Sequence, residues 1–267
     1  MIVCAFGDLT LDVLVRLESP IAARGDTNAD IHVGPGGQAA NVAAWVVALG
    51  ARGRYLGKRG ADDAGRVASR GIEALGVEIR GPNEGRNGVI CSLVEADGER
   101  SMLSDRGAAA DFRPDELEPA WLDGCDHLFV SGYALLREPV RQTALDAVSL
   151  ARKSQAQVSV DLSSWSAIRD SGPDEFRKLL VELAPDVVFA NEDEDEILGG
   201  QLPGVSWILK RGLRGCSFAG EEREALPAVV VDSTGAGDAL AAGFIVGGPD
   251  LALEAAVRCV SRLGSMP

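Results

Sequence analysis

The sequence of 267 residues is poor in the side chains that carry most metal and thiol chemistry. It holds two histidines, His32 and His127, and neither lies near a cysteine or a carboxylate pair at ligand spacing. This argues against zinc sites and against catalytic triads that depend on histidine. Its five cysteines are scattered and form no C-x-x-C pair, which indicates reduced thiols, buried as small apolar side chains, in a cytoplasmic protein.

Several longer patterns are also missing. The apolar run Ile2 to Phe6 follows Met1 without a basic segment before it or a cleavage site after it, so no secretory signal is expected. We find no stretch that approaches the roughly 20 apolar residues of a membrane span. The G-x-x-x-x-G-K-[ST] loop and the catalytic-loop motifs of protein kinases are absent, so phosphoryl transfer would need another scaffold.

Positive charge is scarce as well. The chain has 40 acidic and 26 basic residues, a net charge of -14 and a pI near 4.6. Such a surface repels nucleic acids and anionic lipids, so we expect neither as a partner and predict a small-molecule ligand. The hydrophobic content of 46% gives enough core for one α/β domain over residues 1–267.

Short β-branched runs alternate with amphipathic stretches along the chain. This alternation predicts a mostly parallel, doubly wound sheet covered by helices on both faces, with ligands beyond the carboxyl ends of the strands. The predicted strands are Ile2 to Phe6, Leu128 to Val130, Val158 to Asp161, Val187 to Ala190, Trp207 to Leu209 and Val229 to Val231. The predicted helices are Gln38 to Leu49, Ala64 to Leu75, Glu138 to Ala151, Pro173 to Leu183 and an apolar helix after Gly237.

One segment departs from this alternation. Asn87 to Val94, the Asp97-Gly98 turn and Glu99 to Leu103 have the pattern of a hairpin. With the irregular stretch from Leu11 to Val33, it predicts a small β lid formed from about residues 11–33 and 86–106. The alternative is an ordinary hairpin at the edge of the main sheet.

The most informative string runs from Asp232 through Ser233, Thr234, Gly235, Ala236 and Gly237 to Asp238. Its small residues let backbone N–H groups approach an anion, and the following helix directs its positive end to the same place. Asp238 would stand beside the bound phosphate as a general base, with Asp232 and Thr234 as oxygen ligands for a cation. The alternative for Asp238 is a simple helix cap.

A second glycine-rich string, Gly34 to Asn41, leads into the first long predicted helix. The glycines allow close approach of a ligand, and Asn41 can both donate and accept hydrogen bonds to a hydroxyl-rich compound. The same string loosely fits the dinucleotide fingerprint, but Pro35 in the turn and the lack of an acidic strand end about 20 residues later count against nicotinamide binding.

These two strings resemble the signatures of the ribokinase-like, or PfkB, family of carbohydrate and nucleoside kinases. The resemblance implies a three-layer α/β/α fold with a β lid, ATP with Mg²⁺ as cosubstrate and K⁺ as a further cofactor. It implies an anion hole at Gly235, Ala236 and Gly237, a catalytic base at Asp238 and acceptor contacts from Gly37 and Asn41. Gly7 to Asp12 is similar to the opening strand and turn of the family, where Asp12 would bind acceptor hydroxyls.

Three further landmarks follow from the resemblance. Asn191 and Glu194 match the N-x-x-E motif, which organises Mg²⁺ around the phosphates, although an acidic run such as Glu192 to Glu196 is typical of a solvated helix face. The segment that contains Lys210 and Gly212 resembles the strand end near the nucleotide, with a charged surface turn as the alternative. Arg106 is either a contact for an acidic acceptor or an exposed arginine that aids solubility.

We therefore expect ATP-dependent phosphorylation of a hydroxyl on a sugar, polyol or nucleoside, by an enzyme that pairs into a homodimer through its lid. The stretch between Asn191 and Asp232 is shorter than usual for the family and is expected to lack a helix. This leaves a non-catalytic nucleotide or sugar sensor as one alternative, and an NAD(P)-dependent oxidoreductase as another. Gln38 stands where ribokinase has a lysine, so ribose is not favoured as the acceptor.

Overall fold

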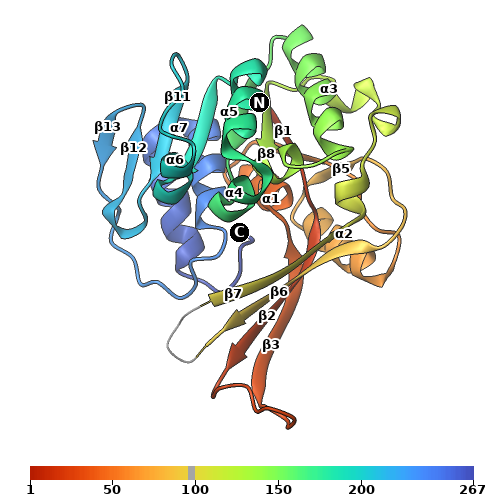
Figure 1. Ribbon diagram of the computed structural model, residues 1–267, viewed down its shortest axis with the longest axis vertical. Coiled ribbons are helices and arrows are strands. Elements are labelled where there is room, and N and C mark those ends of the chain that lie inside the picture. The colour runs from red at the N-terminus through yellow and green to blue at the C-terminus, as the bar shows by residue number, and fades with distance from the viewer. Residues whose placement is uncertain (96–99) are drawn as a thin grey trace.

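The computed structural model of the chain describes residues 1–95 and 100–267, so the predicted Asp97-Gly98 turn and Glu99 lie outside the described residues. Within this part, a nine-stranded sheet forms the centre of the molecule (Figure 1). Its strands are β1 (Ile2–Phe6), β4 (Arg52–Leu56), β5 (Glu78–Arg80), β8 (His127–Ser131), β9 (Gln157–Asp161), β10 (Val187–Asn191), β11 (Ser206–Lys210), β12 (Cys216–Phe218) and β13 (Glu221–Arg223).

The strand order is β13-β12-β11-β10-β9-β8-β1-β4-β5. All neighbours from β11 to β5 are parallel, and β12 and β13 extend this edge by antiparallel pairing. From β1 the strand order runs through β4 to β5 in one direction and through β8 to β13 in the other, as in a doubly wound fold. Because parallel strands end at one edge, the segments after β1, β9, β10 and β11 meet on the same side.

Helices cover both faces of the sheet, as the sequence predicts. α1 (Gln38–Ala48), α2 (Asp63–Ala74) and α7 (Ala236–Val260) pack on one face, and α3 (Val140–Lys153), α4 (Trp165–Ser171), α5 (Pro173–Leu183) and α6 (Glu192–Ile197) pack on the other. Val3 and Ala5 of β1 belong to the first core, and Cys4 and Phe6 to the second, because side chains of a strand alternate between faces. The predicted three-layer α/β/α architecture is confirmed.

A second sheet of four strands projects from the main body (Figure 1). It contains β2 (Thr10–Leu17), β3 (Ala29–Gly36), β6 (Asn87–Val94) and β7 (Arg100–Gly107), in the order β3-β2-β6-β7. β6 and β7 pair antiparallel, as predicted for the hairpin. The alternative of an edge hairpin on the main sheet is wrong, because β6 pairs with β2 instead.

Five of the six predicted strands are present, and the exception is the segment Val229 to Val231. These residues form no strand, and their side chains are 81%, 50% and 46% exposed. The Val231 N–H donates to the carbonyl of Val260, at the end of α7, over 2.7 Å. β-Branched residues form strands only where a neighbouring strand supplies pairing, and none lies beside this segment in the described chain.

α7 corrects a second expectation, because it is long and apolar enough to cross a membrane by length and composition. Two features mark it as a core helix. Gly248 has non-helical torsions and Pro249 follows it, so the helix is broken at this point. Several of its apolar residues, including Ala239, Ala241 and Leu253, are buried in the core that α7 shares with α1.

The expectation of a missing helix holds for most of the stretch between β10 and α7. α6, a short helix, directly follows β10. From Leu198 to Gly235 the chain forms β11, β12, β13 and one 3₁₀ turn, η5 (Gly212–Arg214), without a further α-helix. Four more 3₁₀ turns lie earlier in the chain: η1 (Ala108–Asp111), η2 (Pro114–Glu116), η3 (Pro119–Leu122) and η4 (Gly132–Leu135).

Candidate active site

The glycine-rich turn before α7 contains a position that leaves no room for a side chain. Gly235 has a φ of 77°, and a Cβ at this position would lie 2.6 Å from the Cβ of Ser265. Gly237 and Asp238 follow in the first helical turn, where backbone N–H groups have no partner within the helix. Backbone N–H groups at a helix start, together with the helix dipole, are suited to bind an anion, as the sequence predicts for this turn.

Asp238 is tied to the other glycine-rich motif. The Asn41 side chain donates from Nδ2 to Oδ2 of Asp238 over 2.7 Å, and its Oδ1 accepts from the Ser265 hydroxyl at 3.0 Å. Gly37 begins α1 with a φ of 96°, and a Cβ there would lie 2.4 Å from the Asp8 carbonyl oxygen. Only glycine therefore lets α1 start close enough to bring Asn41 to Asp238.

The environment of Asp238 makes its carboxyl group a better base. The pKa of Asp238 is raised to about 7, chiefly by burial and also by the charge of Asp161, whereas hydrogen bonds from Asn41 and Gln38 and the charge of Lys210 act in the opposite direction. The side chain keeps partial exposure. A carboxylate with this pKa can take a proton from an alcohol during transfer at neutral pH.

Gln38 lies between Asp238 and two serines. Its Oε1 accepts hydrogen bonds from the hydroxyls of Ser131 at 2.5 Å and Ser163 at 2.7 Å. With Oε1 occupied by two donors, the Nε2 amide is left to face the Asp238 carboxylate, whose pKa it lowers. Ser163 holds a φ of 73°, an uncommon value for a residue other than glycine.

A charged cluster lies beside Gly237. Lys210, at the end of β11, donates from Nζ to Oδ2 of Asp161 over 2.7 Å, and Asp161 is 1% exposed. The charges of Asp161 and Glu194 raise the pKa of Lys210 against the effect of burial, so it stays protonated. Its Nζ lies 3.4 Å from the position of a Cβ at Gly237, which puts a cation at the anion site.

Asn191 and Glu194 form the capping box of α6. The Asn191 side chain accepts from the Glu194 N–H, and the Glu194 carboxylate accepts from the Asn191 N–H, both at 2.8 Å. Glu194 is 2% exposed and burial raises its pKa, whereas Glu192 and Glu196 are exposed. The solvated-face alternative thus describes the flanking residues but not Glu194.

Asp232 and Thr234 shape the loop before the turn. Oδ1 of Asp232 accepts from the N–H and the hydroxyl of Thr234, and Oδ2 accepts from the Gly264 N–H at 3.0 Å. Among the described residues no group of three or more His, Cys, Asp or Glu side chains could hold a metal. Mg²⁺ usually reaches such sites on the phosphates of a nucleotide and needs one or two carboxylates, which Glu194 and Asp161 beside Lys210 can supply.

Asp12 lies on the small sheet, next to the start of α1. Its Oδ1 accepts from the Thr10 hydroxyl at 2.6 Å, and a Cβ at Gly36 would lie 2.0 Å from its carboxyl group. Burial raises the pKa of Asp12. The small sheet thus contributes a carboxyl group at the glycine corner from which Gly37 and α1 begin.

Arg106, from β7, is buried in an ion pair rather than exposed. Its Nε and Nη2 donate to the two carboxylate oxygens of Asp8 at 2.6 and 2.7 Å, and its Nη1 donates to the Tyr133 carbonyl at 2.9 Å. Its side chain is 17% exposed. The alternative of an exposed solubilising arginine is wrong. The bidentate pair instead joins the small sheet to the turn after β1.

The structure thus brings Asp238, Gly37 and Asn41 together and sets Lys210 beside Gly237. Gly212 is not drawn into this group, because it lies in an exposed turn after β11 with open space around it. Sequence reasoning missed roles for Asp161, for the serine partners of Gln38 and for Ser265, the partner of Asn41. Asp161 could have been found, since it ends a predicted strand at the ligand-binding edge, whereas Ser163 and Ser265 carry no such signal.

Comparison with known proteins identifies the family. The model of the pfkB family carbohydrate kinases matches residues 2–266. The chain belongs to this family. It is therefore a carbohydrate kinase, a phosphotransferase with an alcohol group as acceptor, and the sequence resemblance is confirmed. The match over the whole chain argues against a nicotinamide-dependent oxidoreductase.

Two curated relatives of this pfkB family member are kinases named for different substrates. The chain is 29% identical over 242 residues to a 5-dehydro-2-deoxygluconokinase of Listeria monocytogenes, covering 79% of this chain and 73% of that enzyme. It is 30% identical over 278 residues to an ATP-dependent ribose-1-phosphate kinase of Halopiger xanaduensis, covering 96% of this chain and 90% of that enzyme. A solved structure of a sugar kinase from Pyrococcus horikoshii with ATP has a TM-score of 0.84 at 22% identity, covering 100% of this chain and 95% of that one.

Proposed function

We propose that this kinase transfers the terminal phosphoryl group of ATP to a hydroxyl of a small sugar-like molecule, with Asp238 as the general base. The observation that carries the proposal is a carboxyl group with a pKa of about 7, fixed by Asn41 in the first turn of α7. A general base works best when its pKa is close to the working pH. A binding protein without catalysis has no need of such a group.

The phosphates are assigned to the anion site at Gly235, Ala236 and Gly237. Backbone N–H groups and the start of α7 stabilise charge there, and Lys210 adds a cation from β11. Asn191 and the turn at Gly212 follow neighbouring strands at the same edge of the sheet, so we assign them to the nucleotide. The acceptor is assigned to Asp12, Gly37 and Asn41, with Arg106 at its far end.

Mg²⁺ bound with ATP supplies charge neutralisation on the phosphates, and we assign Glu194 to hold it. Asp232 and Thr234, predicted as cation ligands, already bond to each other and to the Gly264 N–H. We therefore assign them to shaping the loop that carries the anion site. We also propose that the kinase requires K⁺ for activity, which the assay below tests.

The small sheet is proposed to act as the lid over the acceptor. It brings Asp12 to the site, and closure would exclude water and limit wasteful ATP hydrolysis. Large apolar side chains are exposed on this sheet, namely Ile31 (56%), Val33 (56%) and Leu103 (61%). We propose that a second copy of the chain covers these side chains, which gives a homodimer. A monomer in light scattering would reject the homodimer. The free thiols fit a cytoplasmic location.

The test of the proposal is a Mg-ATP assay coupled to ADP formation. Pentoses, ketohexoses, inositols, nucleosides and sugar acids are each offered, with and without K⁺. ADP formation that depends on one of these acceptors supports the kinase. Saturable ligand binding without ADP formation for all five classes would favour the sensor alternative.

A further inference from the structure

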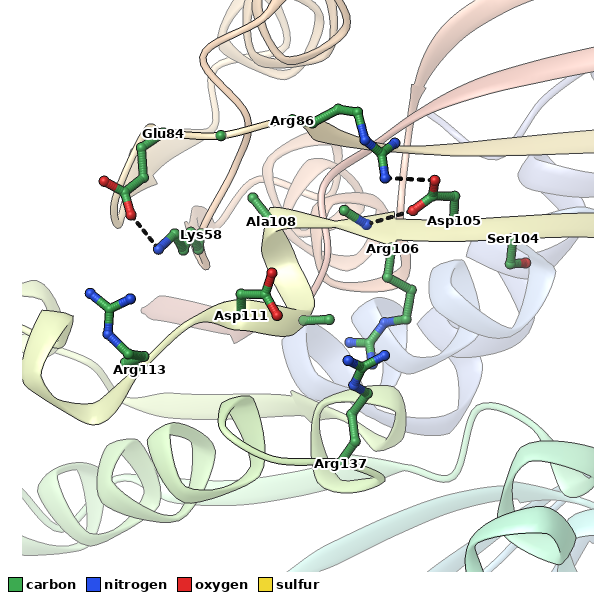
Figure 2. A pocket seen from close by; sticks show the side chains of 13 residues that line it. Lys58, Glu84, Arg86, Ser104, Asp105, Arg106, Ala108, Asp111, Arg113 and Arg137 are labelled. Carbon is green, nitrogen blue, oxygen red and sulfur yellow. Dashed lines mark hydrogen bonds and ion pairs between the residues drawn. The ribbon is translucent and has the colours of Figure 1, made fainter.

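A large cavity lies at the outer edge of the small sheet, apart from the anion site. Its volume is about 890 Å³, and it is bounded by β7, η1, the loop before β6 and the segment after η4 (Figure 2). Arg106 lines it, whereas Asp238, Asn41 and Asp12 do not. Its charged lining consists of Lys58, Glu84, Arg86, Asp105, Arg106, Asp111, Arg113 and Arg137.

Most of these cations are already neutralised. Lys58 bonds to Glu84 and Glu116 at 2.5 and 2.6 Å, and Arg86 pairs with Asp105 at 2.7 Å. Arg113 likewise pairs with Asp115 and Glu116. Such internal pairs give the rim of the cavity little net charge with which to attract a ligand.

Arg137 is different. Over residues 1–95 and 100–267 we find no hydrogen bond or ion pair for its guanidinium group, and the residue is exposed. Figure 2 shows Arg137 reaching into the cavity from below and Arg106 reaching toward it from β7. Both guanidinium groups thus line the same cavity, where an anion would reduce the repulsion between their like charges.

Arg106 has donors to spare for such an anion. A guanidinium has five N–H groups, and Asp8 and the Tyr133 carbonyl take three of those of Arg106. The remaining two belong to Nη1 and Nη2, at the end of the side chain. Arginine is well suited to carboxylate and phosphate groups because its planar donors match their oxygens.

The Arg106 wall of the cavity is connected to the candidate active site through Tyr133. Arg106 stacks over the Tyr133 ring at 5.8 Å from its centroid. The pKa of Tyr133 is raised chiefly by burial, and the charges of Glu194, Asp238 and Asp8 raise it further. Tyr133 thus contacts Arg106. Asp8, the ion-pair partner of Arg106, has its carbonyl oxygen beside Gly37 at the start of α1, so the Arg106 end of the cavity adjoins the proposed acceptor site.

We propose that Arg137, together with Arg106, binds an anionic group on the acceptor itself, so that the preferred acceptor is a sugar acid or a sugar phosphate. This inference rests on the proposed function, because it extends the acceptor site beyond the hydroxyl that Asp238 deprotonates. The shared chemistry is an oxyanion on the same molecule as the accepting hydroxyl. Arg137 is the specificity residue, and Asp8 positions Arg106.

The first test measures binding and needs no turnover. D-gluconate and D-ribose 1-phosphate are titrated by calorimetry against their neutral counterparts, D-glucitol and D-ribose. We expect Arg137→Ala to weaken binding of at least one anionic probe about 10- to 100-fold, the usual worth of hydrogen bonds to a charged group, and Arg137→Lys to weaken it less. Arg70→Ala, which removes an exposed arginine of α2 outside the cavity, is the matched charge control and should leave binding unchanged.

The second test measures kcat and KM in the Mg-ATP assay for the same compounds. Arg137→Ala should raise KM for the anionic acceptor with little change in kcat, and leave neutral acceptors unaffected. Binding that depends on Arg137 without any ADP formation would uphold the anion site and reject the kinase. A kinase that prefers neutral acceptors, with equal constants for the wild type and Arg137→Ala, would overturn the inference and leave the kinase intact.

Discussion

The Asn41 amide donates a 2.7 Å hydrogen bond to the Asp238 carboxylate across 197 positions of sequence. This contact joins the two glycine-rich motifs into one site, since each of the two residues stands in a helix whose start is fixed by a glycine with positive φ. The Asn41 oxygen is itself held by Ser265. The amide can therefore present only its N–H₂ side to the base, which keeps the carboxylate aimed at the glycine-rich turn.

Replacing Asp238 by Asn should stabilise the fold. The pKa of Asp238 is about 7 in the fold and 3.8 ordinarily, so between these values the folded protein binds more protons than the unfolded chain. Wild-type stability attributable to this group therefore falls as the pH rises from about 4 to 7. The Asp238→Asn variant avoids this loss, because its amide is neutral at every pH in this range.

Thermal unfolding at pH 5 and pH 8 checks this prediction. We expect the melting temperature of Asp238→Asn to exceed that of the wild type by more at pH 8 than at pH 5. Asp250→Asn, at an exposed carboxylate, serves as the control. A melting temperature below that of the wild type at both pH values would mean that the Asp238 carboxylate stabilises the fold, contrary to its position beside Asp161.

Gln38 should tune the acidity of the base. Removing its amide by Gln38→Leu takes away a donor to the charged form of Asp238, so the pKa of Asp238 should rise above about 7. The acid limb of kcat/KM then moves to higher pH. Ser163→Ala, which removes one of the two hydroxyls that hold the Gln38 oxygen, should move the limb in the same direction by less.

The pH profile of kcat/KM separates this role from a structural one. A side chain that only supports packing would lower kcat/KM by the same factor at every pH. If the limb of Gln38→Leu coincides with that of the wild type, Gln38 does not act on Asp238.

Lys210 and Asp161 should depend on each other for stability. Lys210→Met leaves the 1% exposed Asp161 carboxylate without its partner, which we expect to cost about 3–5 kcal/mol in the free energy of unfolding. The double variant with Asp161→Asn should recover most of this loss. Lys178→Met, which removes an exposed ion pair with Glu175, should change stability little.

Urea unfolding of these variants measures the free energies. The same Lys210→Met protein should also bind ATP more weakly, because the amine stands at the anion site. A double variant as unstable as the single one would show that the pair is not coupled, and unchanged ATP affinity would remove Lys210 from the nucleotide site.

Acid sensitivity is expected from His127, which is 4% exposed and lies 2.8 Å from the Ser159 hydroxyl. Burial lowers its pKa to about 4 from an ordinary 6.5. The unfolded chain therefore binds a proton that the fold does not, and stability present above pH 6.5 is lost as the pH falls toward 4. The full loss is about 3 kcal/mol for a shift of this size.

Urea unfolding of His127→Gln between pH 4 and 7.5 tests this sign. The variant should lose less stability than the wild type as the pH falls. His32→Gln, at an exposed histidine, is the control. If the free energies of unfolding of His127→Gln and of the wild type fall equally with falling pH, groups other than His127 cause the acid sensitivity.

Most of the fold could be predicted from local pattern. Buried strands such as β10 are continuous apolar runs, and α1 carries an apolar face that ends at Gly50, so both are visible in the sequence. Val229 to Val231 has the composition of a strand but no neighbouring strand, and composition does not reveal whether a partner exists. The strand β4 was missed because it begins with Arg52, Gly53 and Arg54 rather than with an apolar run. The missed strands β5, β12 and β13 are three residues long and depend on pairing in the same way as Val229 to Val231.

The role of a site residue could be predicted where the residue lies in a sequence motif. It could not be predicted where the role depends on a contact with a distant segment of the chain. Asp238 and Asn41 stand in glycine-rich strings whose chemistry can be read directly. The Asp8 partner of Arg106, the Lys210 partner Asp161 and the hydroxyls around Gln38 come from other segments, and only the folded chain brings them together. Arg137 belonged to no motif at all.

Removal of the acceptor proton by Asp238 is tested by the turnover of the Asp238→Asn variant. ADP formation is measured with the acceptor found by the Mg-ATP assay, at pH 8, beside ATP binding by calorimetry. We expect unchanged ATP affinity and a kcat lower by about 10²- to 10⁴-fold, the usual share of general-base catalysis. A kcat within a few-fold of the wild type would contradict it.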